Sequence, residues 1–369
     1  MPQFKSLTAG DPAPHFTQRS LTNPRYGFDT AAGRYLVLCF LHSFREPAAQ
    51  AAIATAIARP DLFDDTHASF FGVSTDPGDE TRLANRIPGY RFILDFDVTA
   101  SKLYGAVAVD GLVRRGLWVV IDPTLRIICT LPFAPDGSDR AALIACIAAL
   151  PPPGRFAGVE LQAPVLYLPR VFEPDFCARL IALYDAHGGE ISGFMRQIDG
   201  KTVGLHDTSH KSRRDVTIDD PTLIATLQGR ILRRVVPEIA KVHQFTVTRM
   251  ERYLVARYAA DEGGHFAPHR DNTTLGTAHR RFAVSVNLND DFDGGEVSFP
   301  EYGSRGFKAP PGGAVVFSCS LLHAVSKVTR GSRYAFLPFL YDDAAAALRH
   351  ANLASLQDTP TQSSSATGT

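Results

Sequence analysis

The chain has 369 residues, of which 45% are hydrophobic and 21% are charged. These proportions are ordinary for a globular protein, and the length leaves room for two domains, because single cores rarely grow beyond about 250–300 residues. Lys and Arg together number 38, as do Asp and Glu, so the formal net charge is zero. A nucleic-acid binder usually carries a basic excess, so this balance disfavours nucleic acid as a partner.

Neither export nor a membrane anchor is predicted. The first 16 residues lack the charged start and the apolar core of a secretory signal. No stretch approaches the roughly 18 consecutive apolar residues of a membrane span. No two cysteines form a CxxC motif, so neither a disulfide framework nor a thiolate zinc site is expected; the cysteines are Cys39, Cys129, Cys146, Cys177 and Cys319. We therefore expect a cytoplasmic protein.

Residues 1–150 alternate between strand patterns and helix patterns. Short apolar runs predict buried strands, and Ala- and Ile-rich stretches predict helices. The expected strands are 35–41, 69–74, 91–94 and 117–121, and the expected helices are 48–58 and 140–150. Strands interleaved with helices indicate an α/β domain. Three prolines and Gly154 then follow Leu150, which predicts an interdomain linker over residues 151–158.

Residues 159–345 are expected to form a second domain, in which helices precede many short strands. A strand candidate at 165–168 is followed by Pro174, which suits the first turn of a helix reaching about Tyr184. Residues 221–243 predict one or two more helices. The later strands are expected at 250–258, 282–288, 296–299, 314–319 and 333–341. This order is typical of a helix-supported double-sheet barrel such as a double-stranded β-helix, or jelly roll. The Ser- and Thr-rich residues 355–369 predict a disordered tail.

The sharpest chemical signal is a His-x-Asp motif followed by a distant histidine. His269 and Asp271 lie two positions apart, so on an extended segment both side chains point to the same face. Together with His323 they supply two imidazoles and one carboxylate, which is the facial triad of non-haem iron. The competing interpretation is a pair of surface loops with incidental histidines.

Two further side chains strengthen the metal interpretation. Arg333 follows His323 at the start of a predicted strand, and turn-like residues 326–332 would let the two lie on neighbouring strands. An arginine there offers a planar fork that can bind a carboxylate with two hydrogen bonds. Tyr258 offers a hydroxyl on the strand that leads to His269.

Several segments resemble, in order, the prolyl-4-hydroxylase-type branch of the Fe(II)/2-oxoglutarate oxygenases. They are RYAADEGGHFAPHRDN (257–272), NLNDDFDGGEVSFPEY (287–302), PGGAVVF (311–317) and HAVSKVTRGSRYAF (323–336). The resemblance implies that His269, Asp271 and His323 bind Fe(II), that Arg333 pairs with the distal carboxylate of 2-oxoglutarate, and that Tyr258 hydrogen-bonds to this co-substrate. It also implies a hydroxylase that consumes O2 and converts 2-oxoglutarate to succinate and CO2.

The sequence leaves several classes of substrate open. An unactivated C–H of a small-molecule or amino-acid-like substrate is expected, with a peptidyl proline or another protein residue as the alternative. A binding or sensing module without turnover is the alternative of another class. Arg270, Asn272 and Arg281 beside the motif are candidate contacts for an anionic substrate, or else solvated loop charges. The basic string at 210–214 has the same two interpretations, and a homodimer is possible.

One co-substrate contact departs from the pattern. Members of that branch often place a second aromatic side chain near the co-substrate, on the strand after the His-x-Asp motif. Here residues 282–288 offer Val286 and Asn287 instead.

The N-terminal half resembles the peroxiredoxin branch of thioredoxin-like folds. The likeness rests on AGDPAPHF (9–16), GVSTDPGD (72–79), FILDFDVTASKLYG (92–105) and WVVIDP (118–123). That family has a peroxidatic cysteine at the helix start after the first core strand, but here residues 41–50 read LHSFREPAAQ. Cys39 lies upstream within a strand, where burial would raise its pKa. We expect a fold without thiol chemistry that serves as a scaffold, dimerisation surface or substrate lid.

Overall fold

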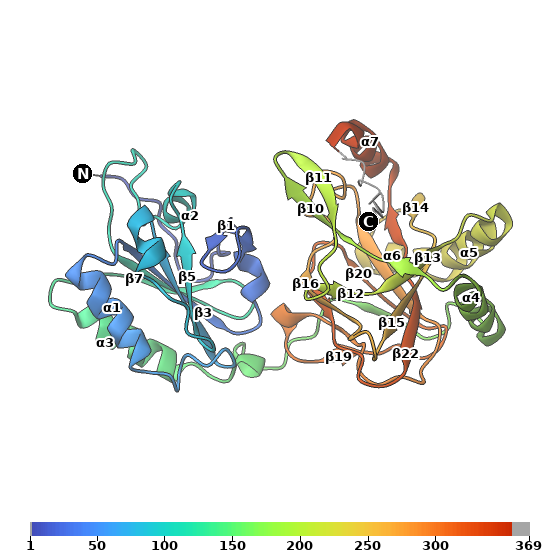
Figure 1. Cartoon of the computed structure of the whole chain (residues 1–369), viewed down its shortest axis with the longest axis horizontal. Helices are drawn as coiled ribbons and strands as arrows, with labels where there is room; N and C mark the ends of the chain where they lie inside the picture. The colour runs from blue at the N-terminus through green and yellow to red at the C-terminus, as the bar shows by residue number, and fades with distance from the viewer. Residues whose placement is uncertain (1, 356–369) are drawn as a thin grey trace, which may run out of the picture. The chain divides into compact units, whose positions relative to one another are not determined.

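The structure is a computed structural model that describes residues 2–355 (Figure 1). The chain divides into two compact units, Met1–Gln162 with Pro300–Ser304, and Ala163–Phe299 with Arg305–Thr369. The finer boundaries at residues 150 and 159 stay a prediction, and residues 356–369 of the expected disordered tail lie outside the described residues. Within the described range, no helix combines the length and apolar character needed to cross a membrane.

The N-terminal unit is built, within the described residues, on a seven-stranded sheet in the order β2-β1-β5-β4-β3-β6-β7. Its centre consists of the parallel strands β3 (Tyr35–His42), β4 (Ala68–Ser74) and β5 (Tyr90–Leu94). The strands β6 (Leu117–Ile121) and β7 (Ile127–Pro132) continue it in antiparallel sense. All residues of β3, β4 and β6 are buried, which explains their continuous apolar sequences.

Two helices cover one face of this sheet. The helices α1 (Pro47–Ile57) and α3 (Ser138–Ala149) share one apolar cluster with β3 and β6 and lie side by side (Figure 1). The triple proline after Leu150 ends α3 as predicted. The remaining elements are β1 (Thr17–Ser20), β2 (Tyr26–Gly27), η1 (Phe28–Ala31), η2 (Pro77–Thr81), α2 (Thr99–Leu103) and η3 (Pro153–Arg155). The prediction of an α/β, thioredoxin-like unit is confirmed.

The C-terminal unit contains three antiparallel sheets, counting the described strands: two large ones and the two-stranded hairpin of β10 and β11. The larger has nine strands, in the order β14-β23-β17-β22-β15-β13-β9, with β20 joined to β17 and β8 joined to β20. The smaller has five, in the order β12-β16-β21-β18-β19. This is the double-sheet, jelly-roll architecture that the sequence predicts. The strands are β8 (Leu166–Leu168), β9 (Glu190–Ile191), β10 (Phe194–Ile198), β11 (Lys201–Leu205), β12 (Lys211–Ser212), β13 (Arg214–Thr217), β14 (Arg249–Glu251), β15 (Leu254–Ala259), β16 (His265–His269), β17 (Phe282–Asn287), β18 (Val297–Ser298), β19 (Gly306–Phe307), β20 (Ala314–Ser318), β21 (His323–Val325), β22 (Ser332–Phe336) and β23 (Phe339–Tyr341).

Two strands predicted as continuous are each divided. Residues 250–258 form β14 and β15, because Arg252 between them has a φ of +64° and breaks the extended conformation. Residues 333–341 form β22 and β23, with Pro338 in the gap. Proline cannot donate a ladder hydrogen bond, so it interrupts a strand.

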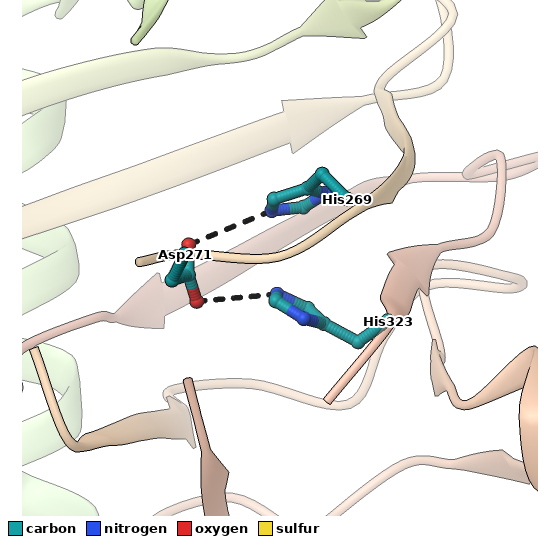
Figure 2. A group of neighbouring side chains, drawn as sticks. All are labelled: His269, Asp271 and His323. Carbon is teal, nitrogen blue, oxygen red and sulfur yellow. Dashed lines mark ion pairs between the residues drawn. The ribbon is translucent and has the colours of Figure 1, made fainter. Parts of the chain in front are cut away.

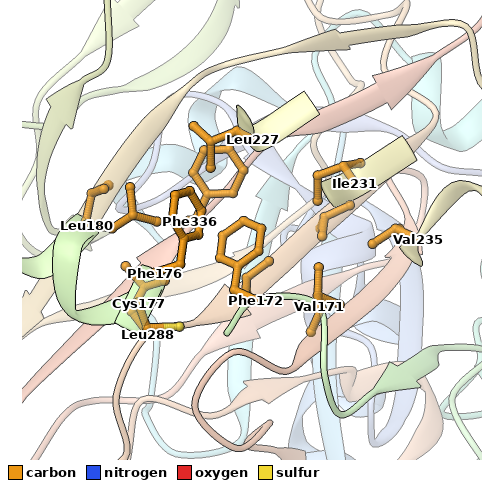
Figure 3. Close-up of a cluster of buried hydrophobic side chains, with 14 of the residues drawn as sticks. Val171, Phe172, Phe176, Cys177, Leu180, Leu227, Ile231, Val235, Leu288 and Phe336 are labelled. Carbon is orange, nitrogen blue, oxygen red and sulfur yellow. The ribbon is translucent and has the colours of Figure 1, made fainter. Parts of the chain in front are cut away.

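Helices cover the outer face of the nine-stranded sheet. The helices that share its apolar cluster are α4 (Pro174–His187), α5 (Pro221–Arg234) and α6 (Val236–His243). The helix α7 (Asp343–Ala351) follows β23, and the short turns η4 (Pro300–Tyr302) and η5 (Leu353–Ser355) lie elsewhere. Figure 3 shows Phe176, Leu227 and Ile231 from α4 and α5 packed with Phe336 of β22. Full burial of one such side chain contributes about 1.5–3 kcal/mol, so this layer anchors the sheet.

Strand alternation then directs polar groups to the opposite face. Along β17, Val284 and Val286 join the apolar cluster under the helices. Their neighbours Ser285 and Asn287 lie on the other face, where both contact Arg333 of β22. The period of two thus separates the supporting core from the candidate site.

Candidate active site

The smaller sheet brings the three predicted metal ligands together. His269 at the end of β16 is paired in register with His323 at the start of β21, and Asp271 follows β16 by two residues. His269 Nε2 lies 3.6 Å from one Asp271 carboxylate oxygen, and His323 Nε2 lies 3.3 Å from the other (Figure 2). All three ligand atoms lie within 4.8 Å of one another, which suits a single cation.

The backbone fixes which nitrogen of each imidazole faces this centre. His269 Nδ1 lies 2.8 Å from the carbonyl oxygen of Ala267, and His323 Nδ1 lies 3.0 Å from that of Leu321. A carbonyl oxygen only accepts hydrogen bonds, so each Nδ1 carries the ring hydrogen and donates a hydrogen bond to that oxygen. The lone pair of each Nε2 is then left for a metal.

The ionisation states also suit metal binding. Burial lowers the pKa of His323 to about 4, and the neighbouring His269 acts in the same direction, so the imidazole is neutral near pH 7. Burial alone would raise the pKa of Asp271, but His323 and His269 hold it below the usual range of a carboxyl. A neutral imidazole and an ionised carboxylate are the forms that bind metal.

Arg333 contributes a buried guanidinium from the larger sheet. Its side chain is 2% exposed, its Nε donates to Asn287 Oδ1 at 2.9 Å, and one terminal nitrogen donates to Ser285 Oγ at 2.7 Å. The other terminal nitrogen has no hydrogen-bond partner, and no carboxylate among residues 2–355 forms an ion pair with Arg333. A buried charge without a counter-ion is costly, so this arrangement suits an anionic ligand.

Tyr258 stands beside that guanidinium. It lies opposite Arg333 in the β15–β22 register, and its ring centre is 5.3 Å from the Arg333 guanidinium carbon. The Tyr258 hydroxyl oxygen accepts from Arg213 at 3.3 Å. Its own hydrogen is therefore available to donate to a ligand bound at Arg333.

The expectation that His323 and Arg333 occupy neighbouring strands is wrong. β21 belongs to the five-stranded sheet and β22 to the nine-stranded sheet. Because residues 326–331 pass from one sheet to the other, both side chains line the same pocket from different sheets. The candidate metal ligands and the candidate carboxylate anchor thus belong to opposite layers.

Strand β17 contributes polar side chains to the pocket at the position where related oxygenases often have a second aromatic side chain. Val286 packs under the helices, whereas Asn287 bonds to Arg333 and donates through Nδ2 to the carbonyl oxygen of Ala309 at 2.8 Å. The sequence could indicate Asn287 as a departure from the family pattern, but not its role in orienting Arg333.

The predicted substrate contacts lie outside the pocket lining. Arg270 donates to the carbonyl oxygen of Ser320, Asn272 bonds to the Ser320 hydroxyl at 2.7 Å, and Arg281 donates to the carbonyl oxygen of Ala278 at 2.9 Å. Their role in substrate binding stays a prediction.

Two other arginines, Arg213 and Arg252, line the pocket instead. Arg213 belongs to the basic string at 210–214, for which substrate contact was one of two interpretations. Arg252 was missed. The available signal was weak, because the predicted strand 250–258 contains two further charged residues, Glu251 and Arg257.

The match to a known protein family falls on the segment that holds this site. Residues 253–341 match the family model of the 2OG-Fe(II) oxygenase superfamily, so the C-terminal unit holds a 2OG-Fe(II) oxygenase domain. That segment contains all three residues of the triad together with Arg333 and Tyr258. The superfamily description names iron and 2-oxoglutarate, which are the metal and the dianionic co-substrate that these side chains suit.

Individual relatives resemble different parts of the chain. A PKHD-type hydroxylase of Cupriavidus metallidurans is 32% identical over 149 residues, which cover 37% of this chain. The chain spans 64% of the length of that relative. The peroxidoxin BcpB of Mycobacterium tuberculosis is 18% identical with a TM-score of 0.34, over 40% of this chain and 99% of BcpB. A Trichoplax adhaerens prolyl hydroxylase, solved with a hypoxia inducible factor peptide, is 16% identical with a TM-score of 0.38, over 50% and 86%.

Proposed function

We propose that this chain is an Fe(II)/2-oxoglutarate-dependent dioxygenase that hydroxylates an unactivated C–H of a small-molecule or amino-acid-like substrate. In this reaction 2-oxoglutarate and O2 are consumed, and succinate and CO2 are released. The observation that carries the proposal is one pocket with two complementary features. Three metal-ligand atoms lie within 4.8 Å of one another, and a buried Arg333 in the same pocket has an unpaired N–H.

The side chains present fit both groups. His269, Asp271 and His323 would hold Fe(II), which supplies the activation of O2 needed to oxidise a C–H bond. Arg333 would bind the distal carboxylate of 2-oxoglutarate, and Tyr258 would donate a hydrogen bond to it. Ser285 and Asn287 keep the guanidinium in place, so little side-chain freedom is lost when the anion binds.

Apolar side chains surround the candidate metal centre. Phe266 stacks on the His269 ring with centroids 3.5 Å apart, and Phe317 packs against His323 at 4.6 Å. Val297 and Val325 complete this side of the pocket. A surrounding of low polarity excludes water and strengthens charge-assisted hydrogen bonds to a bound anion.

The test is succinate release by the full chain supplied with Fe(II), 2-oxoglutarate and O2, with and without candidate substrates. We expect turnover by the wild-type protein and none by Asp271→Ala, because the triad then lacks its only carboxylate. Asp219→Ala is the matched control, since Asp219 is exposed and outside the pocket. Unchanged succinate release by Asp271→Ala would overturn the proposal. A capped proline peptide in the same assay distinguishes the protein-hydroxylase alternative.

A further inference from the structure

The pocket contains more positive charge than iron and 2-oxoglutarate together require. Within the described part of the chain, its lining includes three arginines: Arg213, Arg252 and Arg333. The proposed function uses Arg333 for the distal carboxylate of 2-oxoglutarate. The other two need a separate explanation.

Arg213 is mostly engaged by its neighbours. Its side chain is 4% exposed, and one terminal nitrogen donates to Asp215 at 2.6 Å and to Ser192 Oγ at 3.0 Å. The other donates to the Tyr258 hydroxyl, while Nε is buried without a hydrogen-bond partner. This arginine therefore links the Asp215 carboxylate to the co-substrate pocket, and its Nε–H remains without an acceptor.

Arg252 is far less engaged. Its guanidinium makes no hydrogen bond to any of residues 2–355, and its one ion pair, with Asp215, is long at 3.7 Å. The same Asp215 oxygen already accepts from Arg213 at 2.6 Å. The adjacent carboxylate of Glu251 is occupied by His279 at 2.9 Å and Arg280 at 2.8 Å. Arg252, whose side chain is 27% exposed and whose guanidinium carbon lies 5.2 Å from the centre of the Phe339 ring, thus lines the pocket with a charge that no close carboxylate matches.

The backbone of Arg252 adds an independent observation. Its φ of +64° lies in the left-handed region, which a long side chain rarely occupies because of its Cβ. Strained conformations of this kind concentrate at functional sites, where surrounding structure enforces them. Here the strained residue divides β14 from β15 at the point where its side chain enters the pocket lining.

The positive charges of the pocket outnumber its negative charges by one, even when Fe(II) and 2-oxoglutarate are included. With both groups bound, the two positive charges of Fe(II) and the one of Arg333 would be matched by Asp271 and by the two carboxylates of 2-oxoglutarate. Arg213 and Arg252 then share only the carboxylate of Asp215. One positive charge in a mostly apolar pocket is left for a further anion.

The size of this excess favours a monoanion. Burial lowers the pKa of nearby Lys211 to about 5, so its amine adds no charge near neutral pH. Burial lowers the pKa of Arg252 to about 10, and Arg213 acts in the same direction, so Arg252 stays charged there. A carboxylate carries one negative charge, whereas a phosphate ester carries nearly two at neutral pH.

We propose that Arg252, beside Arg213, binds a carboxylate of the substrate, so that the substrate is a small carboxylic acid. This inference rests on the proposed function and specifies its substrate class. An arginine can bind a carboxylate with two parallel hydrogen bonds and so orient the rest of the molecule toward the triad. An internal proline of a peptide has no carboxylate, and its backbone is neutral.

The test measures binding without turnover. The full chain is loaded with Zn(II) in place of iron and saturated with 2-oxoglutarate, which occupies Arg333. The probes are acetate, propionate, butyrate and benzoate, each compared with its primary amide, and a capped proline peptide. Saturation-transfer difference NMR detects weak complexes of such small probes. We expect the wild-type protein to bind at least one carboxylate at millimolar concentration and to bind its amide and the peptide much more weakly.

Variants locate the binding group. Arg252→Gln should weaken carboxylate binding roughly tenfold or more, since a charge-assisted pair is lost. Arg252→Lys should retain part of it, because the charge remains. The matched control is Arg249→Gln, which removes an exposed arginine of β14 that pairs with Asp343, and it should bind like the wild type.

Three results would overturn the inference. They are no binding of any carboxylate by the wild type, equal binding of acids and amides, or unchanged carboxylate binding by Arg252→Gln. The proposed function fails in a different way, namely if 2-oxoglutarate itself does not bind to the Zn(II)-loaded wild type in the same samples.

Discussion

The two units of this chain use their polar side chains in opposite ways. In the N-terminal unit the one thiol near the expected reactive position, Cys39, is fully buried on β3, and burial raises its pKa well above the usual value. The start of α1 offers Ala48 and Ala49 where a thiolate would be needed. In the C-terminal unit, by contrast, two sheets direct a metal triad and Arg333 into one pocket.

This difference shows that a fold and its chemistry depend on different residues. The apolar runs of β3 and β6 keep the N-terminal sheet buried whether or not a reactive thiol is present. The C-terminal chemistry depends on a few side chains that face away from the helix-covered core. A unit can therefore keep its architecture without the reactive thiol.

The sharpest way to test the C-terminal side of this comparison is Arg333→Ala. It should weaken 2-oxoglutarate binding by about 2–5 kcal/mol, the usual effect of truncating one partner of a buried charge pair. Calorimetry with Zn(II)-loaded protein measures the effect, and Zn(II) binding itself should change little. Arg330→Ala is the control, because Arg330 is 63% exposed and pairs with Asp293 at 2.6 Å. If Arg330→Ala lost the affinity instead, the anchor would be misassigned.

A smaller effect is expected from Asn287→Ala. Asn287 accepts from Arg333 Nε, and losing a hydrogen bond to a charged group costs about 1.5–3 kcal/mol. The Michaelis constant for 2-oxoglutarate should rise less than in Arg333→Ala, while the iron affinity stays unchanged. An equal loss of iron and 2-oxoglutarate affinity would indicate general damage to β17 rather than a positioning role.

The metal-free protein should lose stability in mild acid. Burial lowers the pKa values of His210 and His323 to about 4, whereas their ordinary value is 6.5. Between these values the unfolded chain binds protons that the folded chain does not, so the free energy of unfolding falls as pH drops from about 6.5 to 4. Urea unfolding at several pH values measures the slope. His210→Gln should reduce it, and a slope that is unchanged or reversed would contradict the burial argument.

The smallest expected effect concerns the N-terminal unit, which should reduce no peroxide through Cys39. A reactive thiolate needs a lowered pKa, and burial does the opposite here. Peroxide consumption by the full chain with a thiol donor should equal that of Cys39→Ser. Activity above background that disappears in Cys39→Ser would remove the contrast between the two units. A scaffold, dimerisation or lid role for this unit stays a prediction.

The sequence predicted the elements whose burial is complete. Residues 117–121 and 35–41 match β6 and β3 almost to the residue, because a strand buried on both faces requires continuous apolar side chains. Strands such as β10, β12 and β21 were not predicted, since they are short or half-exposed and are defined by their partners.

The candidate site was predictable where spacing alone decides proximity. His269 and Asp271 lie two residues apart, and the order of motifs identified His323, Arg333 and Tyr258 as their companions. The separation of His323 and Arg333 into different sheets was not predictable, because it depends on long-range pairing. Arg252 enters the pocket lining through a left-handed backbone angle that residue type disfavours, so propensity argued against it.

The central claim is that one Fe(II) binds at His269, Asp271 and His323 and that 2-oxoglutarate binds beside it. Anaerobic calorimetry of the full chain with Fe(II), followed by 2-oxoglutarate, tests this most directly. We predict one iron per chain, lost in Asp271→Ala and retained in Asp219→Ala, and 2-oxoglutarate binding that is much tighter after iron is added. Equal iron binding by Asp271→Ala, or 2-oxoglutarate affinity that does not depend on iron, would contradict the account.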